Sequence, residues 1–147
     1  MKSLLDRESF NEIKDRLTKL TEDSERQWGK MTPGQMARHC QAPLEIMLQK
    51  NDYGVKPNWL INLLFKRSMY NDKPWRKNLP TAPSFRITDD RDFAVEKAKL
   101  VDLIDEIGTK LDKEDWGKHP AFGKLTTRQW GQMQYKHLDH HLRQFGL

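Results

Sequence analysis

The sequence contains a single cysteine, Cys40, and no long apolar run. One thiol excludes an intrachain disulfide framework and a cysteine-rich zinc module, and it suits a reducing compartment. No window approaches the roughly 18 apolar residues that a membrane span requires. Charged residues also interrupt the N-terminus, where a secretory signal needs an apolar stretch. We therefore expect a soluble, cytoplasmic protein without a membrane partner.

Hydrophobic residues are scarce, at 36% of the 147-residue chain, and charged residues are plentiful, at 32%. Disorder is nevertheless not expected, because the chain has five tryptophans and its apolar residues recur periodically. A chain of this length can bury one core, whereas two domains would each be small. We predict one domain over residues 1–147.

The formal charge of +5 conceals an uneven distribution of charge. Residues 66–77 hold five Lys and Arg with one Asp, whereas residues 89–115 hold ten acidic and five basic residues. Tyr70 and Trp75 interleave the basic stretch, and such a mixture can stack on bases and neutralise phosphates. Because basic and aromatic side chains of a long loop more often pack on the protein body, nucleic acid is the less favoured partner. Pairing between the two stretches would also explain the asymmetry.

Apolar residues recur at helical spacing through most of the chain. The pattern predicts five helices, which cover roughly residues 7–22, a segment starting at Thr32, a short segment within 57–69, Asp89 to Leu111, and Thr126 to Phe145. Residues 69–88 hold three prolines and predict a long connection or lid. No stretch shows convincing strand alternation, so the predicted fold class is all-α.

Two of the predicted helices begin alike, with "WGKMTPGQM" at 28–36 and "FGKLTTRQW" at 122–130. In each, a threonine (Thr32 or Thr126) can cap the helix, and a glutamine three residues later completes a capping box. An ancient duplication and the similarity of all good helix starts explain this match equally well.

Histidines concentrate in the last predicted helix, in "KHLDHHLRQFG" (136–146). At about 100° per residue, His137 and His141 share one side of the helix, one turn apart, with Trp130 and Gln134. This side should turn inward, where a buried imidazole needs partners for its donor and its acceptor. A divalent metal can bind both rings, but the pair alone is a weak signal, and a solvated or hydrogen-bonded pair would look the same.

His39 adds a third imidazole, one turn after Gln35 in the second predicted helix. Pro43 follows it by four residues and removes a helical hydrogen bond. Either the helix is distorted at a functional site, or it ends near Gln41. Three histidines from two helices would leave an open coordination position, which is typical of catalytic rather than structural zinc.

The pair of motifs "MTPGQMARHC" and "QYKHLDHHLRQFG" resembles the DinB/YfiT-like superfamily of four-helix bundles. The chain is most similar to a branch of conserved proteins of unknown function, marked by HP-x-FG and KHLDHHLRQFG. This resemblance covers nearly the whole chain and implies a four-helix bundle with an extra short helix and a long connecting loop. It also implies a divalent metal, zinc or nickel in first place and iron in second, with His39, His137 and His141 as ligands.

The resemblance further implies a metal-dependent enzyme that acts on a small-molecule substrate, as a hydrolase or as a transferase that uses a low-molecular-weight thiol. It also implies a homodimer. The alternative is a non-catalytic metal-binding or stress-associated binding module.

Four further residues lie near these motifs. Gln144, three residues beyond His141, can bond a ligand ring or a metal-bound water, with a plain surface position as the equal alternative. His140 points away from the histidine pair, toward the flank of the helix, and is a second candidate for a supporting role. Cys40 is turned about 100° from the preceding histidine and is expected to be buried and inert. His119, in "KHPAFGK", is expected to cap its loop rather than to cover the site.

Overall fold

The structure is a computed structural model that describes residues 1–147, the side chain of Ile61 excepted. Its helices are α1 (Arg7–Lys19), α2 (Pro33–Met47), α3 (Trp59–Met69), α4 (Phe93–Gly108) and α5 (Thr127–Arg143). The remaining elements are a short 3-10 helix, η1 (Pro83–Phe85), and two antiparallel strands, β1 (Lys118–His119) and β2 (Gly123–Lys124). The predicted all-α class is confirmed, and the small hairpin and η1 are elements that the apolar spacing did not predict.

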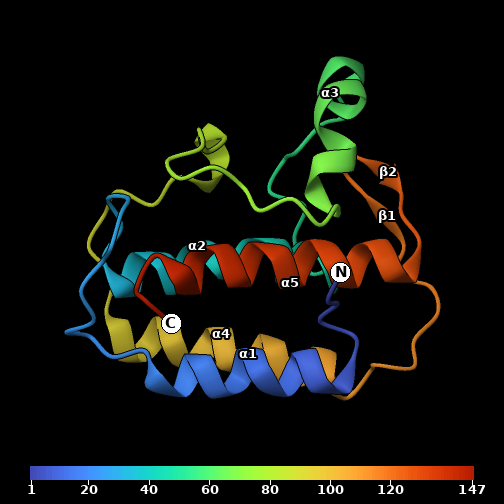
Figure 1. Ribbon diagram of the computed structural model, residues 1–147. Coiled ribbons are helices and arrows are strands. Elements are labelled where there is room, and N and C mark those ends of the chain that lie inside the picture. The colour runs from blue at the N-terminus through green and yellow to red at the C-terminus, as the bar shows by residue number, and fades with distance from the viewer.

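Four of the helices form a bundle. α2 packs on α4 and α5, and α1 packs on α5 and α4, so that each helix touches two others of the bundle. Figure 1 shows α1 and α4 as one layer and α2 and α5 as the other. α3 and the connection that follows it lie outside the α2 and α5 layer. The predicted extra short helix and long connection are thus both present.

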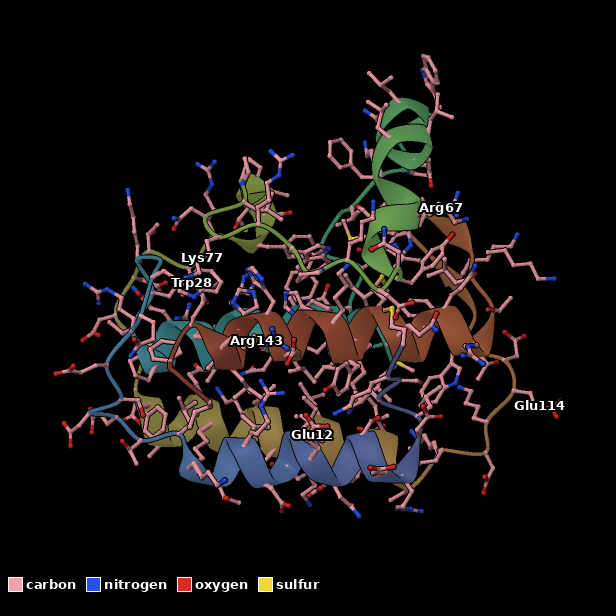
Figure 2. The ribbon with its side chains drawn as sticks, in the orientation of Figure 1. Glu12, Trp28, Arg67, Lys77, Glu114 and Arg143 are labelled. Carbon is pink, nitrogen blue, oxygen red and sulfur yellow. The ribbon has the colours of Figure 1, made fainter. Side chains whose placement is uncertain are left out.

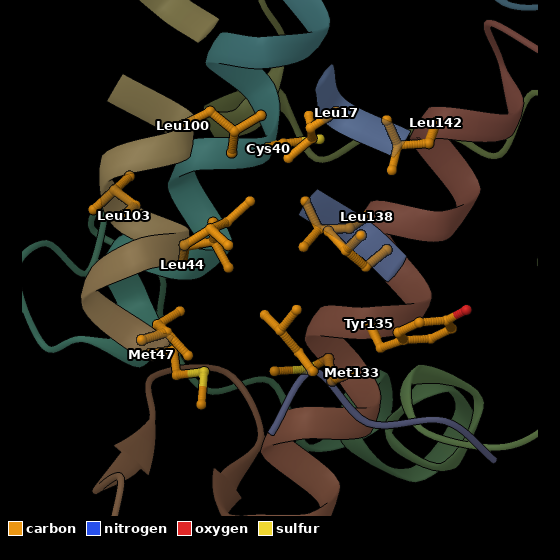
Figure 3. Packing of buried hydrophobic residues seen from close by; sticks show 14 of the residues in the cluster. Leu17, Cys40, Leu44, Met47, Leu100, Leu103, Met133, Tyr135, Leu138 and Leu142 are labelled. Carbon is orange, nitrogen blue, oxygen red and sulfur yellow. The ribbon is translucent and has the colours of Figure 1, made fainter. Parts of the chain in front are cut away.

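The core lies between the two layers. Each bundle helix contributes an apolar stripe, represented by Leu17, Leu44, Leu100 and Leu138 (Figure 3), and these side chains are at most 2% exposed. Burying one such side chain stabilises the fold by about 1.5–3 kcal/mol. The apolar contacts between the layers therefore fix how α2 and α5 lie relative to each other.

The starts of α2 and α5 are fixed by capping boxes, as predicted. The Thr32 hydroxyl accepts from the backbone N–H of Gln35 at 3.2 Å, and the Gln35 side chain accepts from the Thr32 N–H at 3.0 Å. Thr126 and Gln129 form the same pair of bonds, at 3.2 and 2.9 Å. These two helices carry four of the five histidines. The caps fix where each helix begins, and therefore where each of these histidines lies along and around its helix.

α2 continues through Pro43 to Met47, so the alternative that it ends near Gln41 is wrong. The side-chain amide of Gln134 in α5 donates to the carbonyl of Pro43 at 3.0 Å. This hydrogen bond joins α2 to α5. Pro43 is close in sequence to His39, and Gln134 is close in sequence to His137.

α3 turns its apolar side outward. Leu60, Leu63 and Leu64 share one face by their helical spacing, and they are 48%, 73% and 60% exposed. The polar side faces the hairpin, where Asn62 donates to the carbonyl of Ala121 at 2.6 Å. Among the described residues, no helix is long and apolar enough to cross a membrane.

Candidate metal centre

Three imidazoles converge between the two helices of one layer. His39 comes from α2, and His137 and His141 come from α5. One potential ligand atom on each ring lies within 4.8 Å of the other two, and the side chains are only 7–9% exposed. The i, i+4 pair and the single histidine on the second helix are therefore brought together, as the sequence predicted.

Hydrogen bonds orient two of the three rings. Nδ1 of His39 lies 2.9 Å from the carbonyl oxygen of Phe85, and Nδ1 of His141 lies 2.6 Å from Oε1 of Gln144. Because these oxygens can only accept, each Nδ1 carries the proton and each Nε2 is left with a lone pair. A neutral imidazole that donates through one nitrogen and binds through the other is the usual metal ligand.

The third ring fits the same site. Nε2 of His137 lies 3.1 Å from Nε2 of His39. Two nitrogens at 2.0–2.1 Å from one tetrahedral zinc ion would be about 3.3 Å apart, so the observed spacing suits a shared ion. Nδ1 of His137 is buried without a partner among the described side chains and backbone groups, and such an atom costs about 1–3 kcal/mol. Unlike the other two rings, His137 is therefore not oriented by a described hydrogen bond from its Nδ1.

Burial keeps the cluster neutral. It lowers the pKa of His39, and it lowers the pKa of His137 and His141 well below the usual value, with repulsion between the rings as a further cause. Neutral rings can bind a metal without first releasing a proton.

In the described part of the chain, no carboxylate orients these rings. Asp139 instead pairs with Arg16 at 2.8 Å and with Arg143 at 3.0 Å, and Glu45 accepts from the hydroxyl of Tyr53. Among the described hydrogen bonds, none joins a carboxylate to one of the three histidines.

The connection between α3 and α4 contributes two groups that the sequence analysis missed as site residues. The carbonyl of Phe85, in η1, orients His39, and the ring centroid of Trp75 lies 6.0 Å from that of His137. The three prolines of residues 69–88 were the available signal, because proline restricts the backbone of such a segment. The periodicity of helices gives no information on where such a segment crosses the bundle.

Gln144 is buried against His141, so a plain surface position is wrong for this residue. Its backbone carbonyl accepts from the N–H of Gln27 at 2.6 Å. Gly29 approaches so closely that an added Cβ would lie 2.6 Å from Nε2 of Gln144, and its φ of +86° also favours glycine. The segment that precedes α2 therefore holds the Gln144 side chain in place.

His140 lies at the flank of the cluster, as predicted. Its ring centroid is 4.7 Å from that of Trp28, 5.5 Å from that of Trp75 and 5.1 Å from that of His141. Burial lowers the pKa of His140 to about 4, so this ring is also neutral at pH 7. It is not one of the three grouped ligand candidates.

The other two candidates lie apart from the cluster. Cys40 is fully buried beside the sulfur of Met36, and burial raises the pKa of its thiol, which agrees with an inert role. Nδ1 of His119 accepts from the N–H groups of Ala121 and Phe122 at 3.0 and 3.2 Å. It caps the hairpin turn, as predicted.

Residues 1–146 match the family described as "Protein of unknown function (DUF1569)", and the chain belongs to this family. Comparison with curated proteins and with solved structures finds no match. The family description names no activity, so the chemistry of the site has to be inferred from its geometry.

Proposed function

We propose that this DUF1569 protein is a divalent-metal-dependent enzyme whose metal is bound by His39, His137 and His141. The observation that carries the proposal is the convergence of three neutral, buried imidazoles without a fourth grouped ligand among the described residues. Three protein ligands with an open position are typical of catalytic sites, whereas structural zinc sites usually have four. The resemblance to the DinB/YfiT-like superfamily supports the same assignment.

An all-imidazole ligand set suits zinc, nickel and iron, and we propose zinc or nickel first. When bound there, a divalent ion would supply a Lewis acid that lowers the pKa of a thiol or a water molecule in its open position. The chain's own part is to hold the rings. Phe85 fixes His39, and Gln144 fixes His141, each through the Nδ1 proton.

Thiol-dependent transfer is the reaction that we favour. A thiol has an ordinary pKa near 8.5, so it needs far less help to lose its proton than water does. No carboxylate hydrogen-bonds to the three histidines in the described part of the chain, so a protein base that would serve a hydrolase is not evident there. A small thiol as co-substrate therefore suits the site better than hydrolysis does.

A non-catalytic metal-binding or stress-associated module is the second candidate. The low exposure of the three rings favours it, because a sealed site has little access for substrate. In that case chelation should lower the melting temperature strongly, and the metal should bind no added thiol.

The metal site, which both candidate functions share, is tested by the metal content of untagged protein, measured by plasma mass spectrometry; binding of an added thiol to the metal-loaded protein then separates the enzyme from the non-catalytic module. We expect about one metal ion per chain in the wild type, and loss of that metal in His39→Ala and in His141→Ala. His140→Gln is the matched control, because it changes a neighbouring ring that lies outside the grouped ligands, and it should retain the metal. Metal-free wild type that cannot be reloaded with zinc, nickel or iron would refute the proposal.

A further inference from the structure

α3 is attached to the rest of the protein by its polar side. The side-chain amide of Asn62 donates to the carbonyl of Ala121, and the ammonium of Lys66 donates to the carbonyls of Phe122 and Lys124 at 2.7 and 3.1 Å. Figure 1 shows α3 standing away from the α2 and α5 layer, with the hairpin of β1 and β2 at its side. These bonds therefore turn the apolar side of the helix toward solvent.

Exposed apolar side chains concentrate on this helix. Among the described residues, seven large apolar side chains are 45–77% exposed, and five of them lie on α3. These five form what we call the α3 patch: Trp59, Leu60, Leu63, Leu64 and Phe65. Singly scattered apolar residues are normal on a protein surface, whereas a contiguous group marks a site of interaction with a protein or a membrane.

Basic residues accompany the α3 patch. Residues 53–88 hold seven Lys and Arg with one acid, Asp72, and this acid pairs with the N-terminal ammonium at 3.1 Å. None of the seven bases takes part in an ion pair in the described part of the chain. Pairing between the basic and acidic stretches, which would explain the uneven charge, is thus not found there. The positive charge of this segment is left for a partner.

Arg67 places one of these bases on the apolar side itself. It follows Leu63 by four residues and Leu64 by three, so helical spacing puts the three side chains on one side of α3. The arginine is exposed, and its carbon stem can lie along apolar surface while its charged end reaches outward. Figure 2 shows Arg67 and Lys77 on the same side of the bundle, the side from which α3 projects. Apolar surface and positive charge therefore lie together.

A phospholipid surface with negatively charged headgroups matches this combination. Its phosphates attract the bases, and its acyl region accepts leucine, phenylalanine and tryptophan side chains. Nucleic acid would also attract the bases, but leucine side chains do not stack on nucleotide bases as aromatic ones do. A second copy of the chain could cover the α3 patch, but a twofold interface would bring the unpaired bases of both copies together.

We propose that α3 docks the protein on anionic phospholipid surfaces, with the α3 patch among the headgroups and the bases of residues 53–88 near the lipid phosphates. The inference does not depend on the proposed function, because no group of the histidine cluster takes part in it. The expectation of no membrane partner concerned helices that span a bilayer. A helix that lies in the interface needs only an apolar side and nearby positive charge.

Sedimentation of untagged protein with vesicles provides the test. The vesicles consist of phosphatidylcholine alone, or of phosphatidylcholine and phosphatidylglycerol in equal parts. At low salt we expect the wild type to bind the anionic vesicles and to leave the neutral ones unbound. Added salt should weaken this binding, because it screens the attraction between the bases and the headgroups. Urea denaturation of each variant below establishes that it is folded.

Leu60→Ser tests the apolar part of the contact. It should weaken binding to the anionic vesicles about three- to tenfold, because a leucine that is half buried in the protein loses the remaining burial in lipid. Val95→Ser is the matched control, since Val95 lies on α4 and has the same exposed fraction as Leu60, 48%. It should bind the vesicles as the wild type does.

Lys56→Gln combined with Arg67→Gln tests the electrostatic part. Both bases are exposed, one shortly before α3 and one on it, and their loss should weaken binding to the anionic vesicles about tenfold or more. Arg7→Gln combined with Lys19→Gln removes two exposed bases from α1, in the layer away from α3 (Figure 1). This control changes the net charge equally and should bind as the wild type does.

Trp59→Phe locates the contact. Bromine atoms on lipid acyl chains quench the fluorescence of tryptophan at short range, and Trp59 is 77% exposed, whereas Trp116 and Trp130 are buried. We expect anionic vesicles with brominated lipid to quench part of the wild-type emission. Trp59→Phe should still bind the vesicles, because it keeps an apolar ring, but most of the quenching should be lost.

Several results would overturn the inference. One is a wild type that does not bind anionic vesicles at low salt, and another is a wild-type affinity in both Leu60→Ser and the Lys56 and Arg67 variant. Tighter binding of a single-stranded oligonucleotide, weakened only by the loss of the two bases, would assign the surface to nucleic acid. A dimer that Leu60→Ser dissociates in sedimentation would assign it to a second copy. None of these results alters the metal content, so the proposed function is judged separately.

Discussion

Nδ1 of His141 donates a 2.6 Å hydrogen bond to Oε1 of Gln144, the residue that caps the C-terminal end of α5. The same glutamine accepts from the N–H of Gln27 through its backbone carbonyl. One residue thus ends the helix, anchors the loop before α2 and selects the protonated nitrogen of a candidate ligand. Groups that orient a ligand in this way commonly change metal affinity when they are replaced.

Gln144→Leu should therefore weaken metal binding about 10- to 100-fold, because His141 loses the acceptor that holds its ring and its tautomer. Gln144→Glu keeps an acceptor oxygen at the same position and should bind the metal far more tightly than the leucine variant. Competition with a chromophoric chelator gives both affinities. Equal affinity of the wild type and Gln144→Leu would show that the hydrogen bond does not orient the ring.

Gly29→Ala tests the same contact from the other side. Its positive φ makes any side chain costly, by about 1 kcal/mol or more, and the new Cβ would lie 2.6 Å from Nε2 of Gln144. Gly54→Ala is the control, because Gly54 has a φ of +63° but no heavy atom within 4 Å of the added Cβ. Both variants should lose stability in urea denaturation, but only Gly29→Ala should also weaken metal binding. The idea fails if the two variants bind the metal equally well.

The cluster of His39, His137 and His141 and the capped starts of α2 and α5 are the parts of the structure that the sequence predicted best. Spacing of three to four residues places His137 and His141 on one side of a helix, and a capping box is a local pattern that depends on little else. His39 lies in the part of α2 that follows the capping box at Thr32, before Pro43, so its place on the helix is also set by a local pattern.

Groups from irregular segments could not be found in this way. Phe85 contributes a backbone carbonyl, which any residue type could supply, and Trp28 and Trp75 lie in loops without periodicity. The outward turn of α3 depends on bonds from Asn62 and Lys66 to carbonyls of residues 121–124, which are far away in the sequence. Amphipathic spacing shows that a helix has an apolar face, but not what that face contacts.

Leu63→Lys should leave the free energy of unfolding within about 0.5 kcal/mol of wild type, because the side chain is 73% exposed on α3. Leu44→Ala, at a fully buried position of α2, should instead cost about 2–5 kcal/mol. Urea denaturation measures both. A large loss in Leu63→Lys would mean that the apolar face of α3 is covered in solution, and sedimentation of the same variant would show whether the predicted homodimer covers it.

The free energy of unfolding should decrease as the pH is lowered below about 6.5. Part of this decrease comes from His119. Burial lowers the pKa of this ring to about 4, and the charge of Lys66 contributes. In the unfolded chain the pKa is about 6.5, so between these two values the unfolded state binds a proton that the folded state does not. Each such group reduces stability by up to about 1.4 kcal/mol for each unit that the pH falls, and its contribution is fully present above pH 6.5.

His119→Asn isolates this contribution, because an amide oxygen can replace Nδ1 as the acceptor for the N–H groups of Ala121 and Phe122 but does not titrate. Unfolding by urea, with a chelator present, should give similar stabilities for the variant and the wild type at pH 7. Between pH 6.5 and 4.5 the wild type should lose stability more steeply, since His39, His137, His140 and His141 titrate in both proteins and their effect cancels in the difference. Parallel curves would mean that the ring is protonated in the folded hairpin, and then Nδ1 could not accept the two hydrogen bonds that close the turn.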